Sequence, residues 1–208
     1  MAQKDVGNKV PLHTLKKVED VAAYYDDWAL NNKYDKDMED WNYTGPKETV
    51  NTFLKYETNK DALIFDAGCG TGLVGLELKK FGFNNFHGAD LSEKLLSTIP
   101  LNLYKKLLKS DLNEPTNLKD DTYDAIFCVG TFTFGHVRPN ALNEFIRITK
   151  KGGLICFTIN EGIYKDYGFE KKIKELNKTN LWIEMEFFKS DYIASKDVNA
   201  WLGLYKVK

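Results

Sequence analysis

The chain has 208 residues, which is enough for one domain with a buried core and too short for two full domains. Its 29 Lys and Arg residues nearly balance 30 Asp and Glu residues. The net charge of -1 leaves no basic excess to neutralise a phosphate backbone, so no nucleic acid is expected as a main partner. A hydrophobic content of 43% excludes a disordered chain.

The cysteines and the apolar runs bear on location. Cys69, Cys128 and Cys156 each lie in an apolar or glycine-rich stretch, which favours buried thiols in a reducing compartment over disulfides. No apolar run is long enough to span a bilayer, and the first residues lack the apolar centre of a signal peptide. We therefore expect a cytoplasmic protein with no membrane partner.

Residues 1–60 are expected to form a helical cap on a core of residues 61–208, within one domain of residues 1–208. Residues 18–41 are helical in character and rich in aromatic side chains, and Gly45 and Pro46 then open another helix. These aromatic side chains either pack the helices against the edge of a sheet or cover a pocket from which water must be excluded.

Short apolar runs alternate with helical stretches from about Ile64 onward, which is the pattern of a parallel sheet covered on both faces. The expected strands are residues 62–66, 85–90, 105–109, 125–129 and 154–159. A helix at 73–81 should face the core with Leu73, Val74, Leu76 and Leu78. Before the fifth strand, Pro139 should lie in the first turn of a helix that Gly152 and Gly153 end.

The C-terminal part of the chain departs from this repetition. Residues 182–188 and 200–207 each alternate apolar with polar side chains, which is typical of half-exposed strands. The connection between them, of about twelve residues, has little room for a crossover helix. We therefore expect an antiparallel pair at one edge of the sheet.

A glycine-rich turn follows the first expected strand. It reads Asp66-Ala67-Gly68-Cys69-Gly70-Thr71-Gly72, and such a turn lets backbone N–H groups approach a ligand closely. Gly70, Gly72 and Gly75 fit the dinucleotide pattern G-x-G-x-x-G, whereas Asp66 with the first glycines gives D-x-G-x-G-x-G. A carboxylate there would repel a pyrophosphate and attract an ammonium and a sulfonium, so Asp66 favours a cationic amino-acid nucleoside over NAD.

Two further acids follow the next expected strands. Asp90 ends the second strand, where a carboxylate can accept hydrogen bonds from both hydroxyls of a ribose. Asp111 follows the third strand and can accept from an adenine amino group, while Leu112 can lie on the face of the ring. Each acid alone could be a helix cap, but together they favour a nucleoside site at three successive strand ends.

The order D-x-G-x-G-x-G, A-D-L-S and S-D-L, followed by a C-terminal strand pair, resembles class I S-adenosylmethionine-dependent methyltransferases. Segments 24–29, 43–46 and 129–137 are similar to the methyltransferase-like family named after the Williams-Beuren syndrome chromosome region. The resemblance implies an α/β, Rossmann-like, doubly wound sheet of seven strands in the order 3-2-1-4-5-7-6, with strand 7 antiparallel. It also implies S-adenosyl-L-methionine as the cofactor and S-adenosyl-L-homocysteine as its product.

The resemblance further implies which residues contact the cofactor. Asp66 would face the methionine amino group, Asp90 would hold the ribose, and Asp111 with Leu112 would meet the adenine. The other contacts would be Gly68, Gly70 and Gly72 along the methionine and ribose, Leu91 and Gly130 beside them, and Tyr25 and Tyr34 from an N-terminal segment that closes over the cofactor. No metal is expected.

Methyl transfer from a sulfonium depends on alignment and desolvation more than on an acid or base. His136 follows a strand at its carboxyl end and is the candidate catalytic residue, although a polar loop residue or a helix cap would also explain it. The short N-terminal segment favours a small-molecule acceptor, with O, N, S and C all open as the methylated atom. Two alternatives stay open: a nicotinamide-dependent oxidoreductase that uses the dinucleotide pattern, and a non-catalytic cofactor-binding subunit that regulates a partner enzyme.

Overall fold

The computed structural model describes residues 4–208, so the first three residues of the predicted cap lie outside the described part. The α-helices are α1 (Val18–Trp28), α2 (Lys33–Asp40), α3 (Gly45–Phe53), α4 (Leu73–Lys80), α5 (Glu93–Thr98), α6 (Ala141–Ile148) and α7 (Phe169–Thr179). The strands are β1 (Ile64–Ala67), β2 (Phe86–Asp90), β3 (Lys106–Lys109), β4 (Tyr123–Phe132), β5 (Thr149–Asn160), β6 (Trp182–Ile193) and β7 (Val198–Val207). Short 3-10 helices are η2 (Leu12–Thr14), η3 (Leu30–Asn32) and η4 (Ala194–Lys196).

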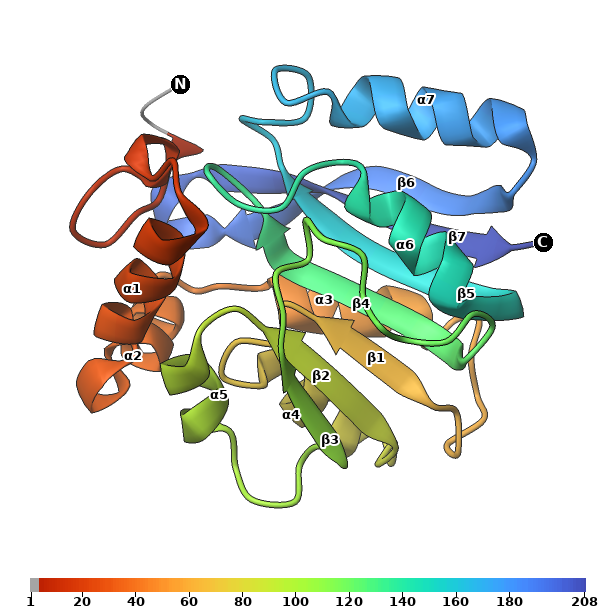
Figure 1. Ribbon diagram of the computed structural model, residues 1–208, viewed down its shortest axis with the longest axis horizontal. Coiled ribbons are helices and arrows are strands. Elements are labelled where there is room, and N and C mark those ends of the chain that lie inside the picture. The colour runs from red at the N-terminus through yellow and green to blue at the C-terminus, as the bar shows by residue number, and fades with distance from the viewer. Residues whose placement is uncertain (1–3) are drawn as a thin grey trace.

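The strands form one seven-stranded sheet in the order β3-β2-β1-β4-β5-β7-β6, as expected. The first five strands pair in parallel, and β7 pairs antiparallel with both β5 and β6 (Figure 1). The short η4 connects β6 to β7, and a connection of this length allows only an antiparallel pair. The expected order and the antiparallel strand 7 are confirmed.

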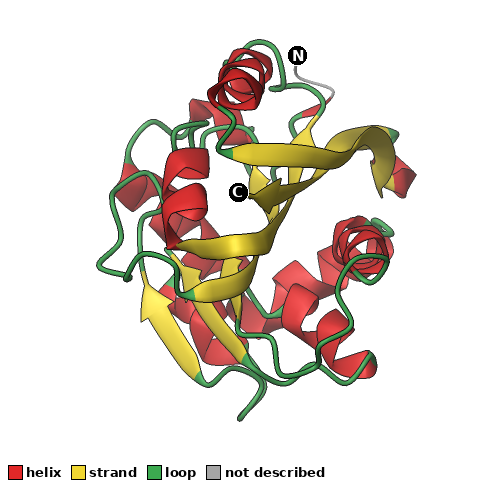
Figure 2. Ribbon diagram, turned by 90° about the vertical axis from the view of Figure 1, so that its right-hand side faces the viewer, coloured by secondary structure: helices red, strands yellow, loops and turns green. Residues whose placement is uncertain are grey.

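Helices cover both faces of the sheet (Figure 2). On one face, α6 and α7 contribute Phe145, Phe169 and Ile173 to a core that also contains Phe157 of β5. On the other face, α3 and α4 pack a second core around Phe53. Because both faces are buried, the parallel strands are almost continuously apolar, which explains the short apolar runs of the sequence.

Two expectations about helices are wrong. The helix after β4 begins at Ala141, with Asn140 as its N-cap, so Pro139 precedes the helix rather than lying in its first turn. The same helix ends at Ile148, and β5 begins at once because Thr149 already pairs with Tyr123 of β4. Gly152 and Gly153 therefore lie inside β5, at a shift of register between β4 and β5, and do not end the helix.

The apolar stripe of α4 is narrower than expected. Val74 and Leu78 are buried together with Gly75, whereas Leu76 is 37% exposed and Leu73 is only partly buried. A Cβ on Gly75 would lie 2.6 Å from the Tyr104 hydroxyl oxygen, so this side of α4 packs against Tyr104.

The N-terminal helices α1 and α2 lie at the edge to which the parallel strands point (Figure 1). The predicted helical stretch 18–41 is interrupted between them, where Asn31 and Asn32 have left-handed backbone angles. Each helix holds the core through one carboxylate. Asp26 accepts from the Ser92 hydroxyl at 2.5 Å, and Asp35 accepts from the Thr71 hydroxyl at 2.6 Å.

No helix within residues 4–208 combines the length and the apolar character needed to cross a membrane.

Candidate functional site

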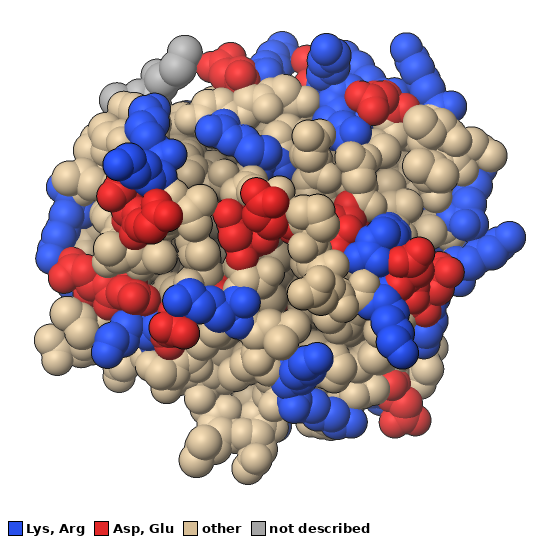
Figure 3. Space-filling view, in the orientation of Figure 1, with Lys and Arg blue, Asp and Glu red and all other residues tan. Residues whose placement is uncertain are grey.

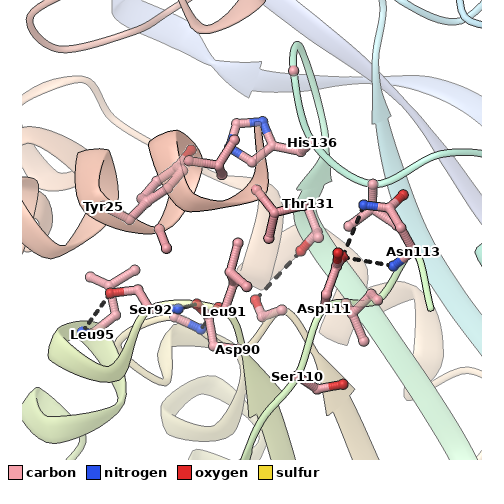
Figure 4. Close-up of a pocket in the computed structure, with 18 of the residues that line it drawn as sticks. Tyr25, Asp90, Leu91, Ser92, Leu95, Ser110, Asp111, Asn113, Thr131 and His136 are labelled. Carbon is pink, nitrogen blue, oxygen red and sulfur yellow. Dashed lines mark hydrogen bonds between the residues drawn. The ribbon is translucent and has the colours of Figure 1, made fainter. Parts of the chain in front are cut away.

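A cavity opens at the carboxyl edge of the sheet, next to α1 and the loop that follows β4 (Figure 4). We call it the strand-end cavity. The predicted site residues that line it are Tyr25, Tyr34, Gly68, Gly70, Asp90, Leu91, Asp111, Leu112, Gly130 and His136. Asp66 and Gly72 are the predicted residues that lie outside this lining. A Cβ on Gly72 would meet Leu103 at 3.1 Å, so Gly72 faces the core beneath α4 rather than the cavity.

Asp66, in β1, is buried with only 2% of its surface exposed. Its Oδ2 atom accepts a hydrogen bond of 2.6 Å from the Tyr104 hydroxyl, whereas its buried Oδ1 atom has no partner among residues 4–208. Burial raises the pKa of this carboxyl to about 7, with the Tyr104 hydrogen bond acting in the opposite direction and Asp90 adding to the rise. An unpaired buried oxygen is costly, so Oδ1 is suited to accept from a donor that a ligand supplies.

Packing, rather than the binding of a pyrophosphate, explains why position 75, the third glycine of the dinucleotide pattern, is a glycine. A Cβ at this position would lie 2.6 Å from the Tyr104 hydroxyl oxygen. The missing side chain therefore makes room for the tyrosine that holds Asp66. Gly75 belongs only to the dinucleotide pattern, and it serves the packing of α4 against Tyr104. The dinucleotide pattern is therefore no evidence for a bound dinucleotide.

Asp90, at the end of β2, is held by the backbone of the glycine turn. Its Oδ2 atom accepts from the Gly70 N–H at 2.8 Å, and its Oδ1 atom accepts from the Ser92 N–H at 2.9 Å. Burial raises the pKa of Asp90, and these N–H groups oppose that rise. Gly70 has a φ of +53°, and a Cβ there would meet nothing within 4 Å, so the backbone of the turn faces open space. A ligand can therefore approach this backbone without a side chain in between.

Asp111 follows β3 and is fixed by the next turn. Its Oδ1 atom accepts from both the backbone N–H of Asn113, at 2.9 Å, and the side-chain amide of Asn113, at 3.0 Å. Leu112 is buried next to it, and Leu91 approaches from the end of β2 (Figure 4). Asp111 and the two leucines thus place one carboxylate and two apolar side chains on the same stretch of cavity wall.

Tyr25 of α1 and His136 of the loop after β4 lie together over the cavity, with ring centroids 5.1 Å apart (Figure 4). The Nδ1 atom of His136 bonds to the Phe134 carbonyl, which can only accept, so the ring proton resides on Nδ1. The Nε2 atom is buried without a partner among residues 4–208. Burial lowers the pKa of His136 to about 4, so the ring is neutral near pH 7.

Several residues of the site carry no local signal in the sequence. Tyr104 holds Asp66 from the loop before β3, and Asp26 and Asp35 attach the N-terminal helices to the core. Thr131, Lys16, Lys17 and Arg138 also line the strand-end cavity. Tyr104 lies in an apolar stretch whose pattern predicts ordinary core residues. Asp26 and Asp35 occupy positions that are typical of the polar face of a helix. Within residues 4–208 there is no cluster of three or more His, Cys, Asp or Glu residues that could hold a metal ion.

Known proteins are similar to this chain in sequence or in fold. The family described as methyltransferase domain matches residues 65–157. Methyltransferase-like protein 27 of Homo sapiens is 32% identical over 197 residues, which cover 88% of this chain and 79% of the human protein. An uncharacterized protein of Methanocaldococcus jannaschii is 33% identical over 164 residues, covering 74% of this chain and 68% of that protein.

Among solved structures, a TehB-like SAM-dependent methyltransferase from Corynebacterium glutamicum aligns with a TM-score of 0.62 at 18% identity. The alignment covers 89% of this chain and 99% of that one, and at this identity it speaks for the fold. The human relative and the domain match confirm the resemblance found in the sequence. They also favour a methyltransferase over a nicotinamide-dependent oxidoreductase and indicate that the cofactor is S-adenosylmethionine. The chain therefore belongs to the class I S-adenosylmethionine-dependent methyltransferases, in the family of human methyltransferase-like protein 27.

Proposed function

We propose that this methyltransferase transfers the methyl group to a small-molecule acceptor. The supporting observation is a second hollow, the aromatic pocket, whose walls include Tyr25, Trp28, Tyr34, Trp41, Tyr43 and Tyr192. This pocket shares Tyr25, Tyr34 and Gly130 with the strand-end cavity. An acceptor bound there would be enclosed by the N-terminal helices, which suits a small molecule better than a segment of a polymer.

The strand-end cavity fits the three parts of S-adenosylmethionine. The Oδ1 atom of Asp66 would accept from the ammonium group and so gain the partner that it lacks. Asp90 would accept the ribose hydroxyls, because each of its oxygens keeps a free lone pair beside its backbone donor. Asp111 would accept from the adenine amino group, with Leu91 and Leu112 on the faces of the ring.

The bound cofactor supplies an electrophilic methyl group on a sulfonium. The chain would contribute alignment and the exclusion of water: Tyr25 and Tyr34 cover the junction of the two hollows, and the missing side chain of Gly130 leaves room there for the Tyr43 hydroxyl. Residues 1–60 would accordingly serve as a cap over residues 61–208. A catalytic role for His136 stays a prediction, and its low pKa suits a hydrogen-bond acceptor better than a group that removes a proton.

The distribution of charge supports a small acceptor over nucleic acid. On the face shown in Figure 3, Lys and Arg side chains alternate with Asp and Glu side chains rather than forming a basic stripe. Some of the basic side chains of the protein are paired with acids, as Arg147 is with Asp120 and Glu144. This mixed pattern lacks the continuous basic surface that the backbone of a nucleic acid would need.

Two measurements test the proposal. Calorimetric titration with S-adenosylhomocysteine should give binding in the micromolar range, and no heat at protein concentrations well above that range would contradict the cofactor site. Transfer of a labelled methyl group is then followed in mixtures of thiols, amines, phenols and carboxylates, in parallel with RNA, DNA and protein. We expect label in the small-molecule fraction, and label confined to a macromolecule would contradict the proposed acceptor.

A further inference from the structure

The aromatic pocket lies on the side of the strand-end cavity toward β6. Tyr25 and Trp28 reach it from α1, Tyr34 from α2, and Tyr192 from the end of β6. The rings contact one another closely, for example Trp28 with Tyr34 at 5.1 Å between centroids. Its volume of about 30 Å³ admits only one or two water-sized groups. The body of an acceptor would therefore enter only when α1 and α2 move outward.

No charged side chain lines this pocket within the part of the chain that the structure describes. The polar groups of its lining side chains are the hydroxyls of its tyrosines and of Thr133, the indole N–H groups of Trp28 and Trp41, and the thioether of Met38. Burial raises the pKa of Tyr192 to about 12, with hydrogen bonds to Tyr43 and Thr158 acting in the opposite direction, so the hydroxyls are neutral at physiological pH. A charged acceptor would lose its hydration here and find no counter-ion.

Carboxylates beyond the lining narrow the choice of acceptor charge further. Asp37 accepts from the indole N–H of Trp28 at 2.7 Å and is paired with Lys33. Burial raises the pKa of the Tyr43, Tyr25 and Tyr34 hydroxyls, and the charges of Asp66 on Tyr43 and of Asp90 on Tyr25 and Tyr34 add to that rise. The same fields would repel an anionic acceptor. A cation would be attracted by the aromatic faces, but a protonated amine has no lone pair to receive a methyl group. Cation–π attraction is also weaker than the cost of burying an ion without a counter-ion.

Two hydroxyls meet where the pocket opens into the strand-end cavity. A Cβ on Gly130 would lie 2.6 Å from the Tyr43 hydroxyl oxygen and 3.6 Å from that of Tyr192. Gly130 has a φ of +82°, and its N–H donates to the Thr158 hydroxyl at 3.0 Å, which fixes the backbone at this point. A tyrosine hydroxyl both donates and accepts, so this pair can hold another hydroxyl beside the cofactor.

We propose, building on the methyl transfer to a small molecule proposed above, that the aromatic pocket receives an uncharged acceptor with a hydroxyl group on a planar apolar body, and that Tyr43 and Tyr192 hold that hydroxyl. In the reaction a lone pair of the acceptor oxygen forms the new C–O bond while the electron pair of the breaking C–S bond goes to sulfur. The hydroxyl proton is released to water. The products are a methyl ether and an uncharged thioether.

Probe molecules that differ only in charge test this assignment. The wild-type protein is first saturated with S-adenosylhomocysteine, and 4-methylphenol, 4-methylbenzoate and 4-methylbenzylammonium are then titrated by ligand-observed NMR. We expect the phenol to bind at least ten-fold more tightly than either ion. Equal or tighter binding of an ion, or no binding of any probe, overturns the proposal.

Variants locate the hydroxyl contact. Tyr43→Phe with Tyr192→Phe should weaken 4-methylphenol about five-fold and leave toluene unchanged, because only the hydroxyl contact is lost. Tyr56→Phe is the control, since Tyr56 is an exposed tyrosine that bonds to Glu186 away from the pocket. Unchanged phenol binding in the double variant overturns the role of Tyr43 and Tyr192. Failure of S-adenosylhomocysteine to bind would instead count against the proposed function, and the probes can be titrated without it.

Discussion

The two hollows at the carboxyl edge of the sheet differ in the charge of the side chains around them. The strand-end cavity has charged side chains of both signs in its wall, namely Asp90, Asp111, Lys16, Lys17 and Arg138, and Asp66 lies next to it. The aromatic pocket, in residues 4–208, has rings and hydroxyls but no charged lining residue. The two hollows share Tyr25, Tyr34 and Gly130, so the change from a charged to an uncharged surface occurs across a narrow boundary.

This difference follows from the parts of the fold that supply each lining. The carboxylates follow neighbouring parallel strands, whose register fixes the places where their side chains meet. The aromatic pocket is closed by α1, α2 and the end of β6, which lie outside the parallel part of the sheet. The cofactor contacts are therefore tied to the sheet, whereas the acceptor contacts depend on segments that can vary without disturbing it.

The largest expected effect concerns Asp66, beside the strand-end cavity. Its ionisation should lower the stability of the protein as the pH rises, which is the opposite of the usual effect of a carboxyl group. Since burial raises the pKa of Asp66 to about 7, its contribution to the free energy of unfolding is complete below its unfolded pKa near 4. That contribution is lost as the pH rises through about 7, at about 1.4 kcal/mol per pH unit. Asp66→Asn removes this titration, so the variant should gain stability relative to the wild type as the pH rises. Urea unfolding without cofactor, from about pH 5 to about pH 8, measures the difference. A difference that stays constant would contradict the raised pKa.

The same substitution should have the opposite effect on cofactor binding. Asp66→Asn loses a charged hydrogen bond to the ammonium group, worth about 1.5–3 kcal/mol, so the Kd for S-adenosylhomocysteine should rise about ten-fold to a hundred-fold. Calorimetry measures the change, with Asp166→Asn as the control because Asp166 is exposed on the loop before α7. Unchanged affinity in Asp66→Asn would remove Asp66 from the cofactor site.

Residues that follow an apolar strand could be predicted from the sequence, because the strand itself is visible as an apolar run. Asp90 and Asp111 line the strand-end cavity and Asp66 lies beside it for this reason. Tyr104 and Tyr192 could not be found in this way, since they reach the site through packing between segments far apart in the chain. A local pattern also gave a wrong prediction. Gly152 and Gly153 are typical of a helix end, but the register between β4 and β5 places them in a strand.

Gly75→Ala tests whether the packing of α4 against Tyr104 requires a glycine at this position. The new Cβ would lie 2.6 Å from the Tyr104 hydroxyl oxygen, and such overpacking costs about 1–3 kcal/mol, of which helix propensity returns up to about 1 kcal/mol. The free energy of unfolding should fall by about 1–2 kcal/mol. In a Tyr104→Leu background the same change should be neutral or stabilising. Urea unfolding of the four proteins gives the coupling, and an equal cost in both backgrounds would show that Gly75 does not serve to admit Tyr104.

Asp26→Ala tests whether the contact between α1 and α5 keeps the strand-end cavity closed over the cofactor. Asp26 accepts from the Ser92 hydroxyl at 2.5 Å and from the Lys94 N–H at 3.2 Å, and thus ties α1 to α5 beside the strand-end cavity. Its loss should weaken S-adenosylhomocysteine about five-fold, mainly through faster dissociation, which stopped-flow displacement measures. The neighbouring Asp27 pairs with Lys9 inside the N-terminal segment, so Asp27→Ala is a matched control with less than about a two-fold effect expected. Equal effects of the two substitutions would argue against a specific tie.

The charge of His136 determines whether the wall next to Tyr25 is charged. We expect that the His136 ring does not change its charge near neutral pH. The ring lies in the wall of the strand-end cavity, yet its proton on Nδ1 is bound to the Phe134 carbonyl and burial lowers its pKa to about 4. Nitrogen NMR of the cofactor-free protein should show the neutral Nδ1–H tautomer, with no change in charge above about pH 5. A ring that titrates near its usual pKa of about 6.5 would place a cation beside Tyr25. An anionic acceptor would then find a counter-ion at the boundary of the aromatic pocket, and the contrast between the two hollows would no longer exclude it.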